Sequence, residues 1–318
     1  AKDKKVHITP ANLLSNLHRS IEAKTTEHIF RKIFHNEHYF TVHAPVPSSC
    51  EFLDEGAANQ TRFTKNRKGL YLFVYGVSQS KKNPGPKKFP GRQTKAAFDV
   101  ITRNHQLPES QIVFAQQQAH AIDAGVFHND VISTGHETLF MYHEETFYNQ
   151  DGVIEELQDK AWSLFNSNLQ MLPISTKEIS LNDAVQSYLF NSQIVTSGSK
   201  KVMLAPTECQ HNISALKILN NIQKSGTIDK VLFISLTESM KNGGGPACLR
   251  IRAPLSEQEI HSLHKGVLFT QRLYEDLYEV IDAHYPDTLR IEQLMNPDFR
   301  KQSTLAHSKI MKILQLMP

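Results

Sequence analysis

Residues 70–77 read Leu-Tyr-Leu-Phe-Val-Tyr-Gly-Val, an apolar and aromatic run that is typical of a strand buried in a sheet. Working outward from this run, similar short strands are predicted at 111–114, 126–133, 138–142, 202–205, 231–236 and 247–253. Helical periodicity lies between several of them, at 94–105, 152–169 and 213–223. Strands that alternate with helices indicate an α/β fold. No internal repeat is evident by eye, although the spaced strands could contain a diverged one.

Both ends of the chain are predicted to be helical. At 10–34 a stripe of leucines recurs with helical spacing, and Thr9 is a suitable N-cap. Near the other end, Ser256 and Glu259 have the spacing of a capping box. We expect the helix that begins there to run towards residue 284.

The composition excludes several classes of protein. Of 318 residues, 40% are apolar, which is enough for a large core, and the net charge of +3 gives no concentrated positive charge for nucleic acid. No apolar run reaches the ~20 residues that span a bilayer, so no membrane partner is expected. Three cysteines without a CxxC pair indicate a reduced, cytoplasmic protein. The start at Ala1 fits a processed or truncated chain as well as a natural one.

A loop at 78–91 combines prolines, glycines and lysines. The favoured interpretation is a solvated surface loop. The alternative is a lid that delivers Arg92 to an anionic group of a substrate.

Three sites carry residues that could do chemistry. Cys248 follows three consecutive glycines, where a thiol could lie near backbone N–H donors that favour its thiolate, although a lone cysteine is more often a buried apolar residue. On the strand predicted at 126–133, His128 and Asp130 would share one face and could form an acid/base pair, although a satisfied histidine beside a turn-forming acid is commoner. Glu55 lies in a stretch of small residues and could orient a histidine, or could be an ordinary loop acid.

Two other kinds of site are less favoured. His35, His38 and His43 lack the context of a metal motif and are interpreted as surface histidines. There is no Gly-x-Ser-x-Gly elbow for a serine nucleophile. Together, the cysteine, the histidine and the two acids form a set suited to thiol chemistry on a cationic carbon.

Longer motifs resemble one family closely. The segment 239–250, Ser-Met-Lys-Asn-Gly-Gly-Gly-Pro-Ala-Cys-Leu-Arg, is similar to the nucleophile motif of the N-succinylarginine dihydrolases. Further matches to that family lie at 17–20, 54–59, 89–94, 114–117, 125–130 and 188–193. The resemblance extends from about residue 6 to beyond residue 255.

The resemblance implies a fold and a reaction. The fold would be α/β, a pentein-type propeller of repeated ββαβ modules in a pseudo-fivefold arrangement, forming a single catalytic domain over 1–318. The reaction would hydrolyse N2-succinyl-L-arginine to N2-succinyl-L-ornithine, two ammonia and carbon dioxide in arginine catabolism. The family implies no metal or organic cofactor, and it implies a homodimer.

The resemblance also implies roles for individual residues. The catalytic residues would be Cys248 as nucleophile, His128 as acid/base and Glu55 as the third member. The residues in contact with substrate would be Asp130, Asn242, Arg92, His18 and Arg19. Basic side chains suit the carboxylates of a succinylated substrate, which arginine can bind through two parallel hydrogen bonds.

One departure from the family pattern bears on activity. Members of the family carry a substantial N-terminal segment before the part that matches here, including a substrate-contacting loop, so we expect an incomplete opening portion of the propeller. Two alternatives to a dihydrolase stay open, and the missing segment favours the second of them. One is a single-round guanidine hydrolase such as an arginine deiminase, and the other is a non-catalytic binding fragment.

Overall fold

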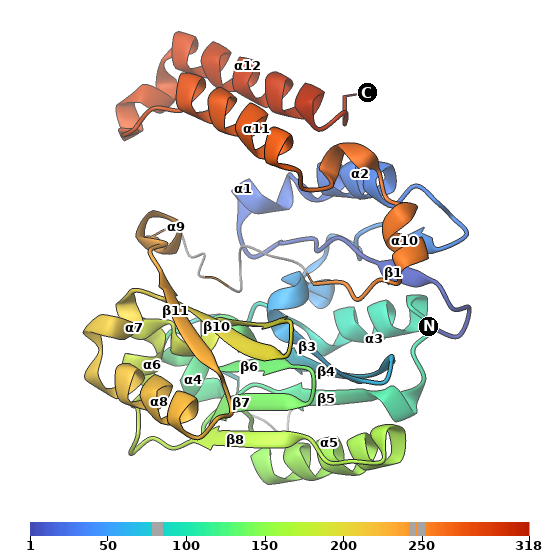
Figure 1. The fold of residues 1–318 in the computed structure, drawn as a ribbon, viewed down its shortest axis with the longest axis vertical. Coiled ribbons are helices and arrows are strands. Elements are labelled where there is room, and N and C mark those ends of the chain that lie inside the picture. Colours follow the sequence, from blue (N-terminus) through green and yellow to red (C-terminus); the bar gives the residue numbers. More distant parts are fainter. Residues whose placement is uncertain (78–84, 242–245, 247–251, 318) are drawn as a thin grey trace. The chain divides into compact units, whose positions relative to one another are not determined.

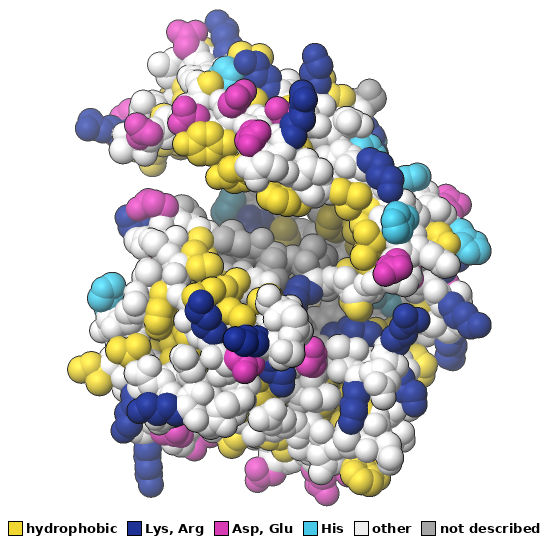
Figure 2. Space-filling view, in the orientation of Figure 1, with side chains coloured by type: hydrophobic (Ala, Val, Ile, Leu, Met, Phe, Trp, Pro, Cys, Tyr) yellow, Lys and Arg dark blue, Asp and Glu magenta, His cyan; other side chains and the backbone are white. Residues whose placement is uncertain are grey.

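The computed structural model describes residues 1–77, 85–241, 246 and 252–317 (Figure 1). The chain forms two compact units. Unit 1 comprises Ala1–Asp3, Thr9–Ala23 and Pro45–Ala253, and unit 2 comprises Lys4–Ile8, Lys24–Ala44 and Pro254–Pro318. A single catalytic domain over 1–318 stays a prediction. On the face drawn in Figure 2, acidic and basic side chains are interspersed over both units.

Unit 1 is a mixed α/β structure that contains three sheets of three strands, each built in the same order (Figure 1). In the first sheet, β3 (Gln60–Lys65) runs antiparallel to β4 (Lys68–Tyr75). The chain then passes through α3 (Lys95–Asn104), and β5 (Ile112–Gln116) pairs with β4 in parallel. The helix makes the crossover that a parallel pair requires.

The other two sheets repeat this order of strand, strand, helix and strand. The second consists of β6 (Ser133–His136), β7 (Leu139–His143), α5 (Gln150–Phe165) and β8 (Gln170–Ile174). The third consists of β9 (Gln193–Ser197), β10 (Lys200–Pro206), α7 (Glu208–His211), α8 (Ile213–Lys224) and β11 (Lys230–Ile234). Short helices lie outside the sheets, at α4 (Ala119–Asp123), α6 (Leu181–Ser187) and α9 (Thr237–Lys241). The structure thus contains a threefold repeat that the residues themselves did not reveal.

The α/β prediction is confirmed, and most of the predicted elements lie within a few residues of the observed ones. The strands predicted at 70–77, 111–114, 138–142, 202–205 and 231–236 are β4, β5, β7, β10 and β11. The strands that were missed include the first strand of each hairpin. These carry polar residues, as in the Gln-Thr-Arg-Phe-Thr-Lys of β3, and their strand conformation is specified by pairing with a neighbour.

The strand predicted at 126–133 is wrong over most of its length. A 3₁₀ turn, η4 (Asn129–Val131), occupies its centre, and β6 begins only at its last residue. The backbone of His128 is extended, with φ −135° and ψ 154°, but Asp130 lies inside the turn. The argument that the two side chains share one face of a strand therefore does not hold. The strand predicted at 247–253 falls largely outside the described residues.

The helix predicted at 10–34 is also wrong in its first half. The observed helices are α1 (Leu17–Ser20) in unit 1 and α2, which spans Ala23–Ile33. Thr9 caps no helix, and its hydroxyl is hydrogen-bonded to a histidine ring. The backbone of Leu13 has φ 53°, and its N–H donates to the carbonyl of Asp54. This early segment is non-helical because it is bonded to a distant loop.

Unit 2 joins a small sheet to the C-terminal helices. Its two strands, β1 (Val6–Ile8) and β2 (Phe40–Val42), pair in parallel. The capping box predicted at Ser256 is present, but its helix, α10 (Glu257–His261), is short. A new helix, α11 (Gln271–His284), begins after Thr270, whose hydroxyl accepts the N–H of Leu273. The last helix is α12 (Pro297–Ile313), which packs against α11.

The first two sheets of unit 1 share one apolar core. Phe63 of β3 and Phe140 of β7 are fully buried, and their rings meet edge-on with centroids 5.2 Å apart. The apolar face of α5 covers the same core through Leu157 and Ala161. Gly135 of β6 lies where the two sheets approach closely, because a Cβ there would lie 2.5 Å from a methyl group of Thr61.

Replacing Gly135 with alanine is therefore expected to destabilise the fold by about 1–3 kcal/mol, the usual cost of overpacking a core. The measurement is the free energy of unfolding in urea. Gly85→Ala is the matched control, because a Cβ at Gly85 meets no atom within 4 Å, and we expect it to change stability by less than about 0.5 kcal/mol. Equal effects of the two variants would contradict the close approach.

Candidate active site

Glu55 lies in a tight bend at the entrance to the 3₁₀ turn η2 (Gly56–Asn59) and is 5% exposed. The bend depends on Gly56, whose φ of 71° is a left-handed conformation that glycine adopts without strain. The N–H of Gly56 donates to the carboxyl of Asp54 at 3.0 Å. A Cβ at Gly56 would also lie 3.1 Å from that of Ala11. The small residues at 54–59 thus allow the chain to pack closely around the acid.

One oxygen of Glu55 contacts both a guanidinium and an imidazole. Oε2 accepts from Arg19 Nη1 at 3.0 Å and lies 3.1 Å from Nε2 of His128. Burial alone would raise the pKa of Glu55, but hydrogen bonds from His128 and Ser15 and the positive charges of His128 and Arg19 outweigh it and lower the pKa. An ionised carboxylate only accepts hydrogen bonds, so Nε2 of His128 carries the proton. Nδ1 is then the ring nitrogen that lies outside this hydrogen bond.

The loop of His128 is held by buried amide side chains. The N–H of Asn129 donates to Oδ1 of Asn59 at 2.8 Å, which ties this loop to the end of η2. Gln117 donates to the carbonyl of Val126 at 2.8 Å. Asn191 donates to the backbone carbonyl of Asp130 at 3.3 Å. The imidazole therefore projects from a backbone that is fixed on both sides.

Arg92 lies over the ring of Phe127, the residue before His128, with its guanidinium carbon 4.3 Å from the ring centroid. Phe89 packs edge-on against the same ring. The backbone before Arg92 is held by the carboxylate of Asp123, which accepts the N–H groups of Lys87, Lys88 and Phe89 at distances of 2.7–3.1 Å. Hydrogen bonds led by that from Lys87 lower the pKa of Asp123. This part of the predicted loop is anchored, and 78–84 lies outside the described residues.

The structure thus brings three of the eight predicted site residues into direct contact, namely Glu55, His128 and Arg19. Asp130 follows His128 by two positions, and Arg92 reaches the same loop through Phe127. His18 is exposed on α1. Cys248 and Asn242 lie outside the described residues.

Of the two cysteines that the structure describes, Cys209 is unlike a nucleophile. Cys209 is fully buried, its thiol lies 3.2 Å from the carbonyl of Ser187, and burial raises its pKa to about 12. Cys50 is exposed in the 3₁₀ turn 50–52. A thiolate is the reactive form of cysteine, so a raised pKa makes Cys209 inert at neutral pH.

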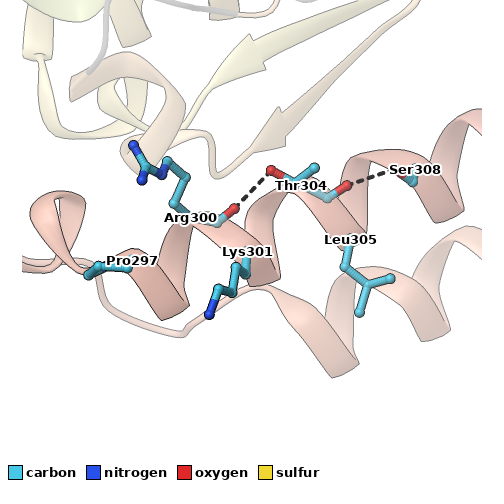
Figure 3. Close-up of a pocket in the computed structure, with 6 residues that line it drawn as sticks. All are labelled: Pro297, Arg300, Lys301, Thr304, Leu305 and Ser308. Carbon is cyan, nitrogen blue, oxygen red and sulfur yellow. Dashed lines mark hydrogen bonds between the residues drawn. The ribbon is translucent and has the colours of Figure 1, made fainter.

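Other kinds of site find little support in the described part of the chain. No group of three or more His, Cys, Asp or Glu side chains there could hold a metal ion, and His43 stacks on His7 with ring centroids 5.1 Å apart. None of the helices in those residues is long and apolar enough to cross a membrane. A shallow pocket on α12 is lined by Pro297, Arg300, Lys301, Thr304, Leu305 and Ser308. Figure 3 shows its two cationic side chains pointing apart, so they do not converge on a ligand.

Sequence reasoning missed several residues that build this site: Asn12, Asp54, Asn59, Gln93 and Phe127. Asp54 and Asn59 lie within the small-residue motif, and Gln93 and Phe127 are neighbours of predicted site residues. Several of their roles depend on distant partners: Gln93 and Glu55 are 38 positions apart, and Asn59 and Asn129 are 70 apart. Nothing local in the chain signals such a pairing.

Comparison with known proteins identifies a family. The sequence model of the succinylarginine dihydrolase family matches residues 1–318. The N-succinylarginine dihydrolase of Shewanella denitrificans is 42% identical over 320 residues, covering 99% of this chain and 71% of that protein. The protein of the same name from Hahella chejuensis is 42% identical over 319 residues with the same coverage. This chain therefore spans 71% of the length of both relatives.

Solved structures were also compared. An agmatine deiminase from C. jejuni has 14% sequence identity and a TM-score of 0.38, covering 77% of this chain and 66% of that one. The amidinotransferase SxtG from Microseira wollei has 13% identity and a TM-score of 0.42, covering 79% and 66%.

The stability of the site is expected to depend on pH through Asp54, which is 1% exposed. Burial raises its pKa from 3.8 to about 6, and the hydrogen bond from the N–H of Gly56 offsets this only in part. The folded state then holds the proton more tightly than the unfolded state. Stability should therefore fall as pH rises from 3.8 to 6, with the full penalty present at pH 7.

Asp54→Asn removes this buried charge and keeps an oxygen that can accept the N–H of Gly56. We expect the variant to be more stable than the parent chain at pH 7, by about 1–3 kcal/mol, and to lose this advantage below pH 4. Urea unfolding at a series of pH values measures the difference. An advantage that is constant across the series would contradict the titration of Asp54.

Proposed function

Because the chain belongs to the succinylarginine dihydrolase family, we propose that it hydrolyses N2-succinyl-L-arginine to N2-succinyl-L-ornithine, two ammonia and carbon dioxide. The match over residues 1–318 carries this proposal, together with 42% identity to N-succinylarginine dihydrolases. The reaction belongs to the succinyltransferase route of arginine catabolism. The hydrogen-bonded group of Glu55 and His128 supports it as an acid/base device.

The first round would begin with transfer of the Cys248 thiol proton to Nδ1 of His128 and attack of the resulting thiolate on the guanidinium carbon. The carbon is resonance-stabilised and a poor electrophile, so the substrate must be held in place, a role suited to the carboxylate of Asp130. His128 delivers a proton from Nδ1 to the departing ammonia, which leaves an S-linked amidino adduct. The charge of Glu55, at 3.1 Å from Nε2, stabilises the imidazolium between these steps.

Water then completes each round. His128 takes a proton from a water molecule, whose oxygen bonds to the adduct carbon as the carbon–sulfur bond breaks. The product of the first round is a ureido compound, and a second round releases another ammonia and a carbamate that loses carbon dioxide. Two waters are consumed for each substrate, which balances the two ammonia and the carbon dioxide.

The succinyl end of the substrate carries carboxylates that need cationic partners. Arg92, His18 and Arg19 are the proposed ones, and Asn242 is a further proposed contact. Arg19 uses Nη1 for Glu55 and has other N–H donors for a substrate carboxylate. One guanidinium could therefore link the catalytic acid to substrate binding.

Membership of the family also supports proposals about the fold. Three sheets with the same ββαβ order support a pentein propeller, for which we propose a pseudo-fivefold ring. Catalysis without a metal or cofactor, a homodimer, and a cytoplasmic location stay predictions.

Ammonia released per N-succinylarginine consumed tests the function directly. We expect a ratio of two, and we expect Cys248→Ser to abolish release because a hydroxyl is a far weaker nucleophile than a thiolate. Cys50→Ser is the matched control, since Cys50 is exposed in a different segment, and it should leave the rate unchanged. A ratio of one would favour a deiminase.

The assay is repeated on a chain that carries, at its N-terminus, the corresponding segment of the Shewanella denitrificans relative. Absence of ammonia from both chains, with both folded, would overturn the dihydrolase proposal and favour a binding role.

Glu55→Gln tests the acid beside His128. Glutamine keeps the shape of the side chain but removes the charge that stabilises the imidazolium, so we expect kcat to fall by about 10²- to 10⁴-fold. Glu51→Gln, an exposed acid four positions earlier, is the control and should keep the parental kcat. Steady-state kinetics with N-succinylarginine measures both, and a loss below threefold in Glu55→Gln would contradict the role.

A further inference from the structure

We propose that the buried amide side chains of Asn12, Asn59 and Gln93 are positioning residues that fasten the segments of the active site to the loop of Glu55. The assignment of these segments to an active site rests on the proposed function. All three amides are at most 2% exposed. In each case the amide oxygen accepts a backbone N–H from a different part of the chain.

Gln93 makes the most direct of these bonds. Its Oε1 accepts the N–H of Glu55 at 2.9 Å, so Gln93 holds the backbone of the catalytic acid directly. The adjacent N–H of Thr94 donates to the carbonyl of Leu53 at 3.0 Å, which makes the attachment two-sided. Arg92 is the residue before Gln93. The position of Glu55 is thereby tied to that of a proposed substrate-binding arginine.

Asn12 fastens the segment that leads to His18 and Arg19. Its Oδ1 accepts the N–H of Asp54 at 3.1 Å, and its Nδ2 donates to the carbonyl of Phe52 at 2.6 Å. The backbone of Leu13 adds a bond to the carbonyl of Asp54. The segment before α1 is thus fixed beside Glu55. Arg19 of α1 contacts Oε2 of Glu55.

Asn59 fastens the segment of His128. Its Oδ1 accepts the N–H of Asn129 at 2.8 Å, one residue beyond the imidazole. Asn59 ends η2, which begins directly after Glu55. The catalytic acid and the catalytic histidine therefore lie on two segments of the chain that the side-chain amide of Asn59 joins.

The chemistry of an amide suits this task. A buried backbone N–H needs an acceptor, and a carboxylate would provide one at the cost of another negative charge near Glu55. An amide oxygen accepts the bond without a charge. The low pKa of Glu55 is thus left under the control of His128, Ser15 and Arg19.

Gln93→Met tests the proposal, because methionine has a similar length and volume but no strong acceptor for the N–H of Glu55. The first readout needs no substrate: the pKa of Glu55, measured by carbon NMR of its carboxyl and assigned with Glu55→Gln. In the parent chain it should lie below 4.5. In Gln93→Met it should rise, because a displaced carboxylate loses its bonds to His128 and Arg19 while burial still raises its pKa.

The second readout is kcat for ammonia release, which should fall at least tenfold in Gln93→Met. Gln158→Met in α5 is the control, since the Gln158 amide oxygen also accepts a backbone N–H, that of Leu169, whose carbonyl accepts from the Gln158 amide nitrogen. It should lose stability but keep the parental kcat and the parental pKa of Glu55. If Gln93→Met does not fold, Gln93→Asn is measured in the same way, because it withdraws the oxygen by about one carbon–carbon bond.

The two readouts separate this proposal from the proposed function. If the parent chain releases no ammonia, the proposed function is wrong. The titration of Glu55 then still decides whether Gln93 positions Glu55. Gln93 variants with the same Glu55 pKa as Gln158→Met would overturn the positioning role. So would active variants whose kcat matches that of the control.

Discussion

A buried carboxylate oxygen, Oε2 of Glu55, is the point on which the site depends. A negative charge that is 5% exposed is costly unless it is paired and hydrogen-bonded, and here Arg19 and His128 meet that requirement together. The two partners come from segments more than a hundred positions apart. The need to compensate one charge therefore brings the α1 segment and the η4 segment to the same place.

The repeated order of elements in the sheets places the segments of Glu55 and His128 close together. Phe63 and Phe140 join the first sheet to the second through a shared core, and the segment between these sheets carries His128. The loop of Glu55 immediately precedes β3, the first strand of that core. The proposed catalytic side chains, Glu55 and His128, thus lie on short connections at the ends of rigid strands, where packing limits their movement.

Stability and chemistry place different demands on the loop at 54–59. Asp54 holds the bend through Gly56, but its burial disfavours the charged form and raises its pKa to about 6. The neighbouring Glu55 has a lowered pKa because hydrogen bonds, led by that from His128, and the charge of Arg19 favour its ionised form. Two adjacent acids in one bend are thereby given opposite shifts by their surroundings, a pattern common at functional sites. Neutral amides attach the other segments without adding charge.

The sequence by itself determined the α/β class and the positions of most inner strands and crossover helices, and by resemblance it predicted catalytic roles for Glu55 and His128. Apolar runs and ordered motifs are local properties, so they can be read along the chain. The tertiary structure alone decided that 126–133 turns at η4, that 9–16 is not helical, and that Arg19 contacts Glu55. It also decided the partners of Asn12, Asn59 and Gln93. Each of these features is set by a hydrogen bond or ion pair between residues 36 or more positions apart, and such a pairing leaves no periodicity in the sequence.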